Sequence, residues 1–142
     1  MPESRDAVWQ GMSSLVHNNR DSWRRAVIGR TGLPFSRIRI LTRLGTGPMT
    51  VKQLAAAATV DAPAATVAVT ELELRGLVNR QTNPANRRTK IVSLTESGRE
   101  MLDLVAAIAD PAPAAFDVLT DDELSTLAQL VAKMAERSPR RN

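Results

Sequence analysis

The order of four short elements in the middle of the chain restricts the fold more than any other feature. Residues 51–58 and 61–75 have the apolar spacing of helices, and a tight turn separates them. Two segments rich in β-branched residues follow at 77–82 and 89–94, with a basic stretch between them. Two helices joined by a tight turn and followed by a basic hairpin form a winged helix-turn-helix. We therefore predict a mainly α-helical fold with a small β-hairpin wing.

Capping signals indicate where these helices begin and end. Thr50 and Gln53 have the spacing of a capping box, in which each side chain accepts a hydrogen bond from the other residue's backbone N–H. Asp61 is a suitable N-cap for the second helix. Gly76 is a suitable cap for its C-terminal end, where the chain must turn into the hairpin.

Further helices are expected on both sides of this motif. The spacing predicts one helix over Ser4–Ile28 and another over Phe35–Leu44. After the hairpin, Thr95 is the expected N-cap of a fifth helix. The run Thr120–Glu123 has the pattern of a second capping box, which would open the last helix.

The first and last helices carry apolar stripes that one small core cannot fully cover. Pairing two copies of the chain would bury these stripes, and completing a monomeric helical core is the alternative. A two-fold dimer would present two reading helices about one duplex turn apart, which predicts an inverted-repeat operator. The residues expected at the dimer interface are Val8, Met12, Leu15, Leu124, Leu127, Leu130, Val131 and Met134.

Several sequence runs resemble the MarR family of bacterial regulators: GPMTVKQLA (Gly47–Ala55), LELRGLVNR (Leu72–Arg80), NPANRRTKIVSLTESGREML (Asn83–Leu102) and LTDDELSTLAQLV (Leu119–Val131). The wing followed by Leu-Thr-x-x-Gly is fairly specific. The resemblance implies a homodimer held by its first and last helices, operator binding, most commonly repression, and frequent responses to small aromatic or phenolic ligands. The implied domains are a dimerisation helix (1–32), a winged helix-turn-helix DNA-binding domain (33–96) and C-terminal linker and dimerisation helices (97–142).

The second helix of the motif is the element expected to read DNA. One face is apolar and should join the core, so the opposite face should meet base edges. The family pattern usually has Ser, Thr and Arg in the first two turns, whereas this chain has Pro63, Ala64 and Val67, and only Thr66 matches. Such a face can make few hydrogen bonds to bases but can contact thymine methyl groups. Wing contacts and DNA shape would then supply much of the specificity, and the alternative is a helix that reads little or nothing.

Adjacent arginines at the hairpin tip, Arg87 and Arg88, are the strongest functional pair, and an ordinary solvated turn is the alternative. In the family pattern an Asp precedes these arginines and pairs with one of them. Asn86 stands in that place here, and it can hydrogen-bond an arginine without forming the charge pair. The full set of expected DNA-binding residues is Thr50, Lys52, Pro63, Ala64, Thr66, Val67, Thr70, Arg75, Arg80, Asn86, Arg87, Arg88 and Lys90.

A group of aromatic and cationic residues is the candidate effector pocket. In the family such a pocket lies between the dimer helices and the reading domain. Aromatic side chains with a cation would suit an anionic aromatic ligand. Ordinary core or surface positions are the alternative for these residues, which are Trp9, His17, Trp23, Arg24, Phe35 and Arg39.

Composition limits the other classes of function. The net charge of +4 suggests a polyanionic partner, which with the motif indicates double-stranded DNA. There is no cysteine and one histidine, so we expect no thiol switch, no metal site and no cofactor. No phosphate-binding loop or nucleophile motif indicates an enzyme, and no apolar run or signal peptide indicates a membrane, so a cytoplasmic protein is expected. A winged-helix module that binds protein, with little or no DNA readout, remains the alternative.

Overall fold

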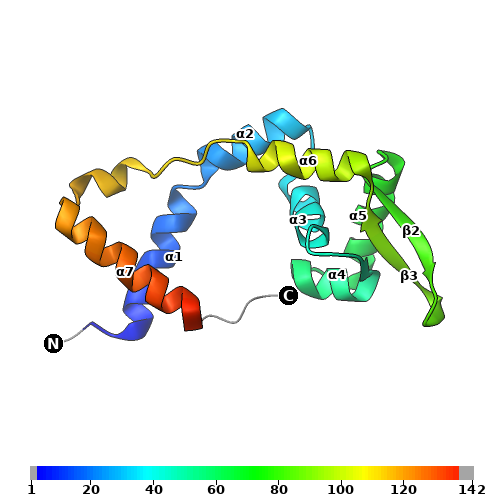
Figure 1. The fold of residues 1–142 in the computed structure, drawn as a ribbon, viewed down its shortest axis with the longest axis horizontal. Coiled ribbons are helices and arrows are strands. Elements are labelled where there is room, and N and C mark those ends of the chain that lie inside the picture. The colour runs from blue at the N-terminus through cyan, green and yellow to red at the C-terminus, as the bar shows by residue number, and fades with distance from the viewer. Residues whose placement is uncertain (1–2, 138–142) are drawn as a thin grey trace. The chain divides into compact units, whose positions relative to one another are not determined.

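The structure is a computed structural model and describes residues 3–137 (Figure 1). Its mainly helical fold with a hairpin wing confirms the predicted fold class. The helices are α1 (Arg5–Asn18), α2 (Asp21–Thr31), α3 (Phe35–Leu44), α4 (Val51–Ala58), α5 (Ala62–Leu74), α6 (Glu96–Ala106), the 3₁₀ helix η1 (Ala114–Val118) and α7 (Asp121–Arg137). The strands are β1 (Met49–Thr50), β2 (Val78–Asn83) and β3 (Asn86–Leu94).

The chain divides into two compact units, and the first ends at Ala109. This unit contains the winged helix-turn-helix together with α6, while the second unit contains η1 and α7. The boundaries expected after residues 32 and 96 divide the chain by function and not by compactness, so they stay predictions. Within the described residues, no helix has the length and apolar character needed to cross a membrane.

The core of the first unit lies beneath the helix-turn-helix. Leu41 of α3, Leu54 of α4 and Leu72 of α5 are fully buried, and Val92 of β3 joins them from the sheet. Full burial of one such aliphatic side chain contributes about 1.5–3 kcal/mol. This shared core fixes α5 against α3, α4 and the wing, so the face of α5 that points away from it is set by packing.

The three strands form one antiparallel sheet in the order β1-β3-β2. Strand β1 pairs Met49 with Val92 and Thr50 with Ile91. Sequence periodicity does not reveal β1, because two residues are too few to show an alternation. The strand matters for the site because it attaches the start of α4 directly to the wing.

The prediction of one helix over Ser4–Ile28 is wrong. The helical path breaks after Asn18, and a second helix runs from Asp21 to Thr31. At the break, the Asn19 side-chain amide donates to the Leu15 carbonyl at 2.7 Å. Asparagine side chains compete in this way with the backbone for hydrogen bonds, so they favour helix ends over helix interiors.

The two predicted capping boxes form to different extents. At Thr50 both reciprocal hydrogen bonds with Gln53 are present, at 2.9 and 3.1 Å. At Thr120, the hydroxyl oxygen accepts from the Glu123 backbone N–H at 3.2 Å, as predicted. The Glu123 carboxylate accepts from the same Thr120 hydroxyl at 3.1 Å, in place of the backbone N–H of a complete box.

Candidate nucleic-acid interface

The turn between α4 and α5 sets how the candidate reading helix enters the site. Thr59 adopts the left-handed conformation (φ 59°), and the Val60 N–H donates to the Ala55 carbonyl at 3.0 Å. The Asp61 carboxylate then accepts from the Ala64 N–H at 2.7 Å and caps α5. The predicted tight turn and N-cap are both confirmed.

The two predicted faces of α5 are confirmed by burial. Its inner face, Ala65, Ala68, Val69 and Leu72, is buried. The outer face is exposed, and it contains all the candidate contacts from this helix, namely Pro63, Ala64, Thr66, Val67 and Thr70. Val67 is 55% exposed and Leu74 is 83% exposed. The surface that α5 offers to a partner is therefore largely apolar.

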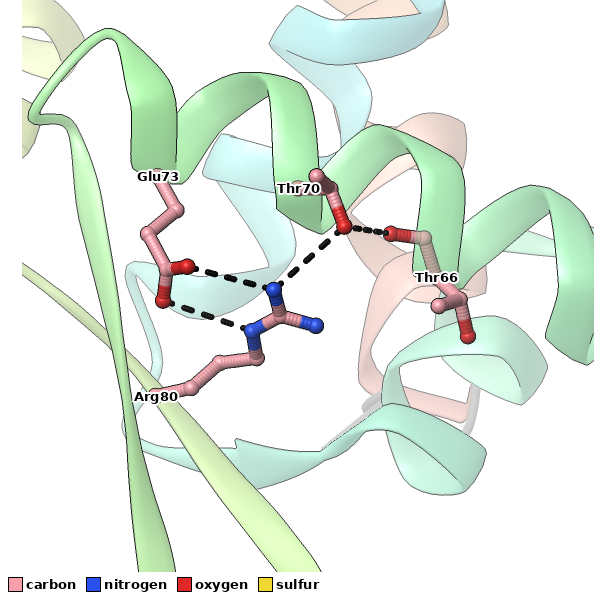
Figure 2. Close-up of polar contacts among 4 residues, drawn as sticks. All are labelled: Thr66, Thr70, Glu73 and Arg80. Atoms are coloured by element: carbon pink, nitrogen blue, oxygen red, sulfur yellow. Dashed lines mark hydrogen bonds and ion pairs between the residues drawn. The ribbon is translucent and has the colours of Figure 1, made fainter.

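The hydroxyl groups of this outer face are engaged within the helix. Thr66 donates to the Ala62 carbonyl at 3.0 Å, and Thr70 donates to the Thr66 carbonyl at 2.9 Å. The Thr70 oxygen also accepts from Nη2 of Arg80 at 3.4 Å (Figure 2). Since a hydroxyl carries a single hydrogen, both groups are left with acceptor capacity only.

Arg80 links the wing to α5 through an ion pair that the sequence analysis did not identify. From β2, its Nε and Nη2 donate to the Glu73 carboxylate at 3.3 and 3.1 Å (Figure 2). The hydrogen bond from Arg80 holds the pKa of the Glu73 carboxyl below its ordinary value. Gly76, at φ 72°, turns the chain from α5 into β2 and so brings the two side chains together.

A second acid on α5 is paired in the same way. Glu71 accepts from Nε of Arg37 on α3 at 2.7 Å. That hydrogen bond lowers the pKa of Glu71 and raises the pKa of Arg37. Both carboxylates near the outer face are thus neutralised by arginines from other elements, which removes a repulsion that α5 would otherwise exert on phosphates. The two glutamates in the helix expected to face DNA were a signal in the sequence, because such acids would repel phosphates unless cations neutralise them.

The wing is a tighter hairpin than predicted. The strand expected at 77–82 is observed one residue later, at 78–83, and the strand expected at 89–94 begins three residues earlier, at 86, so Pro84 and Ala85 alone form the tip. The Asn83 side chain accepts from the Ala85 N–H at 3.0 Å, which stabilises the turn. The pairing shifts register after Thr82, which pairs with Lys90, while Asn83 pairs with Asn86. The two arginines therefore lie at the bulged start of β3 and not in a loop.

Asn86 orders the backbone beside these arginines. Its Oδ1 accepts from the Arg88 N–H at 3.1 Å, whereas the sequence suggested a bond to a guanidinium. Thr89 donates to the Asn86 carbonyl at 3.0 Å and fixes the same segment. Arg87 and Arg88 are exposed, and their guanidinium groups have no ion-pair partner among residues 3–137. Their charges are available to a polyanion.

The remaining candidate cations differ in how available they are. Lys52 on α4 and Arg75 at the end of α5 are exposed. Lys90 is exposed too, and its ammonium donates to the Thr82 hydroxyl across the hairpin at 3.1 Å. Thr50 is the N-cap of α4, and its side chain is engaged in the capping box.

The structure brings together only part of the predicted effector group. Trp23 and Phe35 meet edge to face with ring centroids 5.6 Å apart, and the Arg24 guanidinium lies 5.1 Å from the Phe35 centroid. Trp9 and His17 are exposed on α1, and Arg39 is exposed on α3. A cavity of about 400 Å³ lies elsewhere, between the α3–β1 turn and α6, and none of the six residues lines it.

The apolar residues predicted for a dimer interface are accessible. Most are exposed, and Met12 and Leu127 are half-buried. The exposed members are Val8, Leu15, Leu124, Leu130, Val131 and Met134. Neither α1 nor α7 contains a buried residue, which is unusual for helices with apolar stripes in a chain that acts alone.

Comparison with known proteins identifies the family. The sequence model of the MarR family matches residues 34–90, from the start of α3 to the wing. YwhA of Bacillus subtilis (strain 168), named as an uncharacterised HTH-type transcriptional regulator, is 32% identical over 103 residues, which are 70% of each chain. This chain belongs to the MarR family. The predicted resemblance is confirmed, and MarR family members are DNA-binding transcriptional regulators, not enzymes.

Solved MarR structures share the fold. Wild-type MarR from E. coli in its apo form has a TM-score of 0.73 and 22% identity, covering 88% of this chain and 95% of its own. Sco3205 from Streptomyces coelicolor, a MarR family regulator solved in complex with DNA, has a TM-score of 0.60 and 23% identity. That match covers 100% of this chain and 96% of Sco3205.

Proposed function

We propose that this MarR regulator binds an inverted-repeat operator in double-stranded DNA as a homodimer and represses transcription. The observation that supports it best is that the structure exposes both the outer face of α5 and the arginines of the wing, whose guanidinium groups have no ion-pair partner in residues 3–137. A helix of this kind fits the major groove, while a basic hairpin can reach flanking phosphates. The exposed guanidinium groups of Arg87 and Arg88 have no ion-pair partner in the described residues, so they are free to contact phosphates.

The distribution of charge supports the same arrangement. Lys52, Arg75 and the wing arginines are exposed, whereas Glu71 and Glu73 are paired with arginines. The surface around α5 therefore has cations to meet phosphates and no unpaired carboxylate of its own helix. Neutralising phosphates with such cations releases counterions, so binding should weaken steeply as salt rises.

The exposed stripes of α1 and α7 support the homodimer. A second copy of the chain offers the same two stripes, so a two-fold interface would cover them reciprocally. Such pairing would set two α5 helices at a fixed separation, which is what an inverted repeat requires.

A selection experiment tests this proposal. Purified protein is mixed with sheared genomic DNA, bound fragments are sequenced, and the recovered site is titrated against a random-sequence duplex at several salt concentrations. We expect an inverted repeat with half-sites about one duplex turn apart and steep salt dependence for both duplexes. Recovery of no common sequence, together with salt-independent or absent binding, would favour a winged helix that contacts protein through Val67 and Leu74.

An effector site is the second part of the proposal. Trp23 and Phe35 in edge contact, with the Arg24 guanidinium over Phe35, suit an anionic aromatic molecule. An effector would release DNA only if it bound more tightly to a dimer whose reading helices are misplaced. Salicylate titrated into the protein–operator complex tests this, with Arg24→Ala as the variant that should lose the response. Unchanged operator affinity at saturating salicylate would contradict an aromatic-carboxylate effector.

A further inference from the structure

The stripe of α5 that points away from the core is short of polar groups. Pro63, Val67, Thr70 and Leu74 follow one another at helical spacing along the exposed side. Three of these four side chains carry no polar atom. Direct readout by this stripe must therefore depend heavily on apolar contact.

The polar groups that do flank the stripe are poor donors. The hydroxyl hydrogens of Thr66 and Thr70 are engaged with the carbonyls four residues earlier. Donating to a base would require breaking these bonds, and the Thr70 oxygen also accepts from Arg80 (Figure 2). The stripe thus presents methyl groups and oxygen acceptors to the groove.

Arg80 has few free N–H groups that could donate hydrogen bonds to bases beside α5. Its Nε and Nη2 are engaged with Glu73 and Thr70, and only Nη1 has no partner within the described residues. A guanine contact from Arg80 would have to come from that one nitrogen. Bidentate recognition of guanine, which needs two donors aimed at N7 and O6, would require Arg80 to leave Glu73.

These constraints match one feature of the major groove. Guanine presents two acceptors there, whereas thymine presents its C5-methyl group, which suits small apolar side chains. The first turns of a recognition helix usually contact base edges, and here they carry Pro63, Ala64 and Val67. We propose that α5 reads thymine C5-methyl groups through these three residues, with Val67 at the centre, and does not read guanine. The inference rests on the proposed function, because it requires α5 in the major groove.

Modified DNA tests the proposal directly. In the operator recovered from genomic DNA, each symmetry-related pair of thymines is replaced by deoxyuridine, which lacks only the methyl group. Losing one buried methyl should weaken binding about fourfold, and losing both about 15-fold, by the transfer free energy of such a group. In a parallel series, 7-deazaguanine removes the N7 acceptor, and no loss is expected at base pairs facing α5.

Two protein variants assign the effect to a residue. Val67→Ala reduces the contact with the methyl group. Replacing the sensitive pair of thymines by deoxyuridine should therefore cause almost no further loss of affinity in this variant. Leu74→Ala is the matched control, because it shortens an exposed apolar side chain on the same stripe two turns later, and it should keep the full penalty. Equal penalties in the wild type and Val67→Ala would overturn the assignment. Both side chains are exposed, so neither change should disturb the core.

The outcomes separate this inference from the function on which it rests. If no duplex is preferred over random sequence, the proposed function fails. If an operator is bound but ignores deoxyuridine at every position, the function stands and thymine readout by α5 is wrong. Loss with 7-deazaguanine at the base pairs facing α5 would also overturn it, and would indicate that an arginine near this helix, Arg75 or Arg80, reads guanine.

Discussion

Replacing Arg88 by Ala should change the salt dependence of DNA binding by an amount that depends on the number of wings engaged. Each phosphate contact contributes about 0.9 to the slope of log affinity against log salt. A homodimer carries two copies of Arg88, so the slope should become shallower by about 1.8. The ratio of wild-type to Arg88→Ala affinity should then fall about 12-fold as the salt rises from 50 to 200 mM. It should fall about 3.5-fold if only one wing contacts a phosphate.

The measurement is fluorescence anisotropy of a labelled duplex over that salt range, for the operator and for random sequence alike. Because the Arg88 guanidinium has no ion-pair partner in residues 3–137, the free energy of unfolding should stay within about 0.5 kcal/mol of wild type. Arg25→Ala, which removes another exposed cation from α2, is the matched control and should leave the slope unchanged. An unchanged slope for Arg88→Ala would refute the phosphate contact, and a change near 0.9 would refute engagement of both wings.

Further substitutions test the local geometry. Thr59→Gly should stabilise the fold by roughly 1 kcal/mol in thermal unfolding, since a β-branched residue is strained at φ 59°; a fall in stability would show that no strain is relieved. Gly98→Ala places a Cβ against the backbone oxygen of Leu77 and should cost about 1–3 kcal/mol, whereas Gly11→Ala, inside α1, meets no atom within 4 Å and should stabilise the helix by about 0.5–1 kcal/mol. Glu73→Gln should lower the melting temperature at pH 7, and the difference from wild type should vanish as the pH falls through the depressed pKa, because the carboxylate–Arg80 contact exists only above it. A difference that persists at pH 2 would contradict that origin.

Features fixed by neighbouring residues could be predicted from the sequence. The Thr50–Gln53 box, the Asp61 cap and the αL turn at Gly76 each depend on a few consecutive residues, and the structure contains all three. The division of α5 into a buried and an exposed face follows from periodicity alone. These local signals were enough to locate the reading helix and the wing.

Features fixed by tertiary packing could not be predicted in the same way. Glu71 and Arg37 are 34 residues apart, and their pairing depends on how α3 packs beside α5. The Glu73–Arg80 pair depends on the direction in which β2 leaves α5. The break after Asn18 was missed because apolar spacing continues across it, while the asparagine side-chain competition is weak in the sequence pattern.

The central claim is that two copies of this chain present their α5 helices and wings to one duplex. Native mass spectrometry of the purified protein with the recovered operator duplex tests it most directly. We expect a complex of two chains and one duplex that loses signal when either half-site is scrambled. A complex of one chain per duplex, unaffected by scrambling the second half-site, would contradict it.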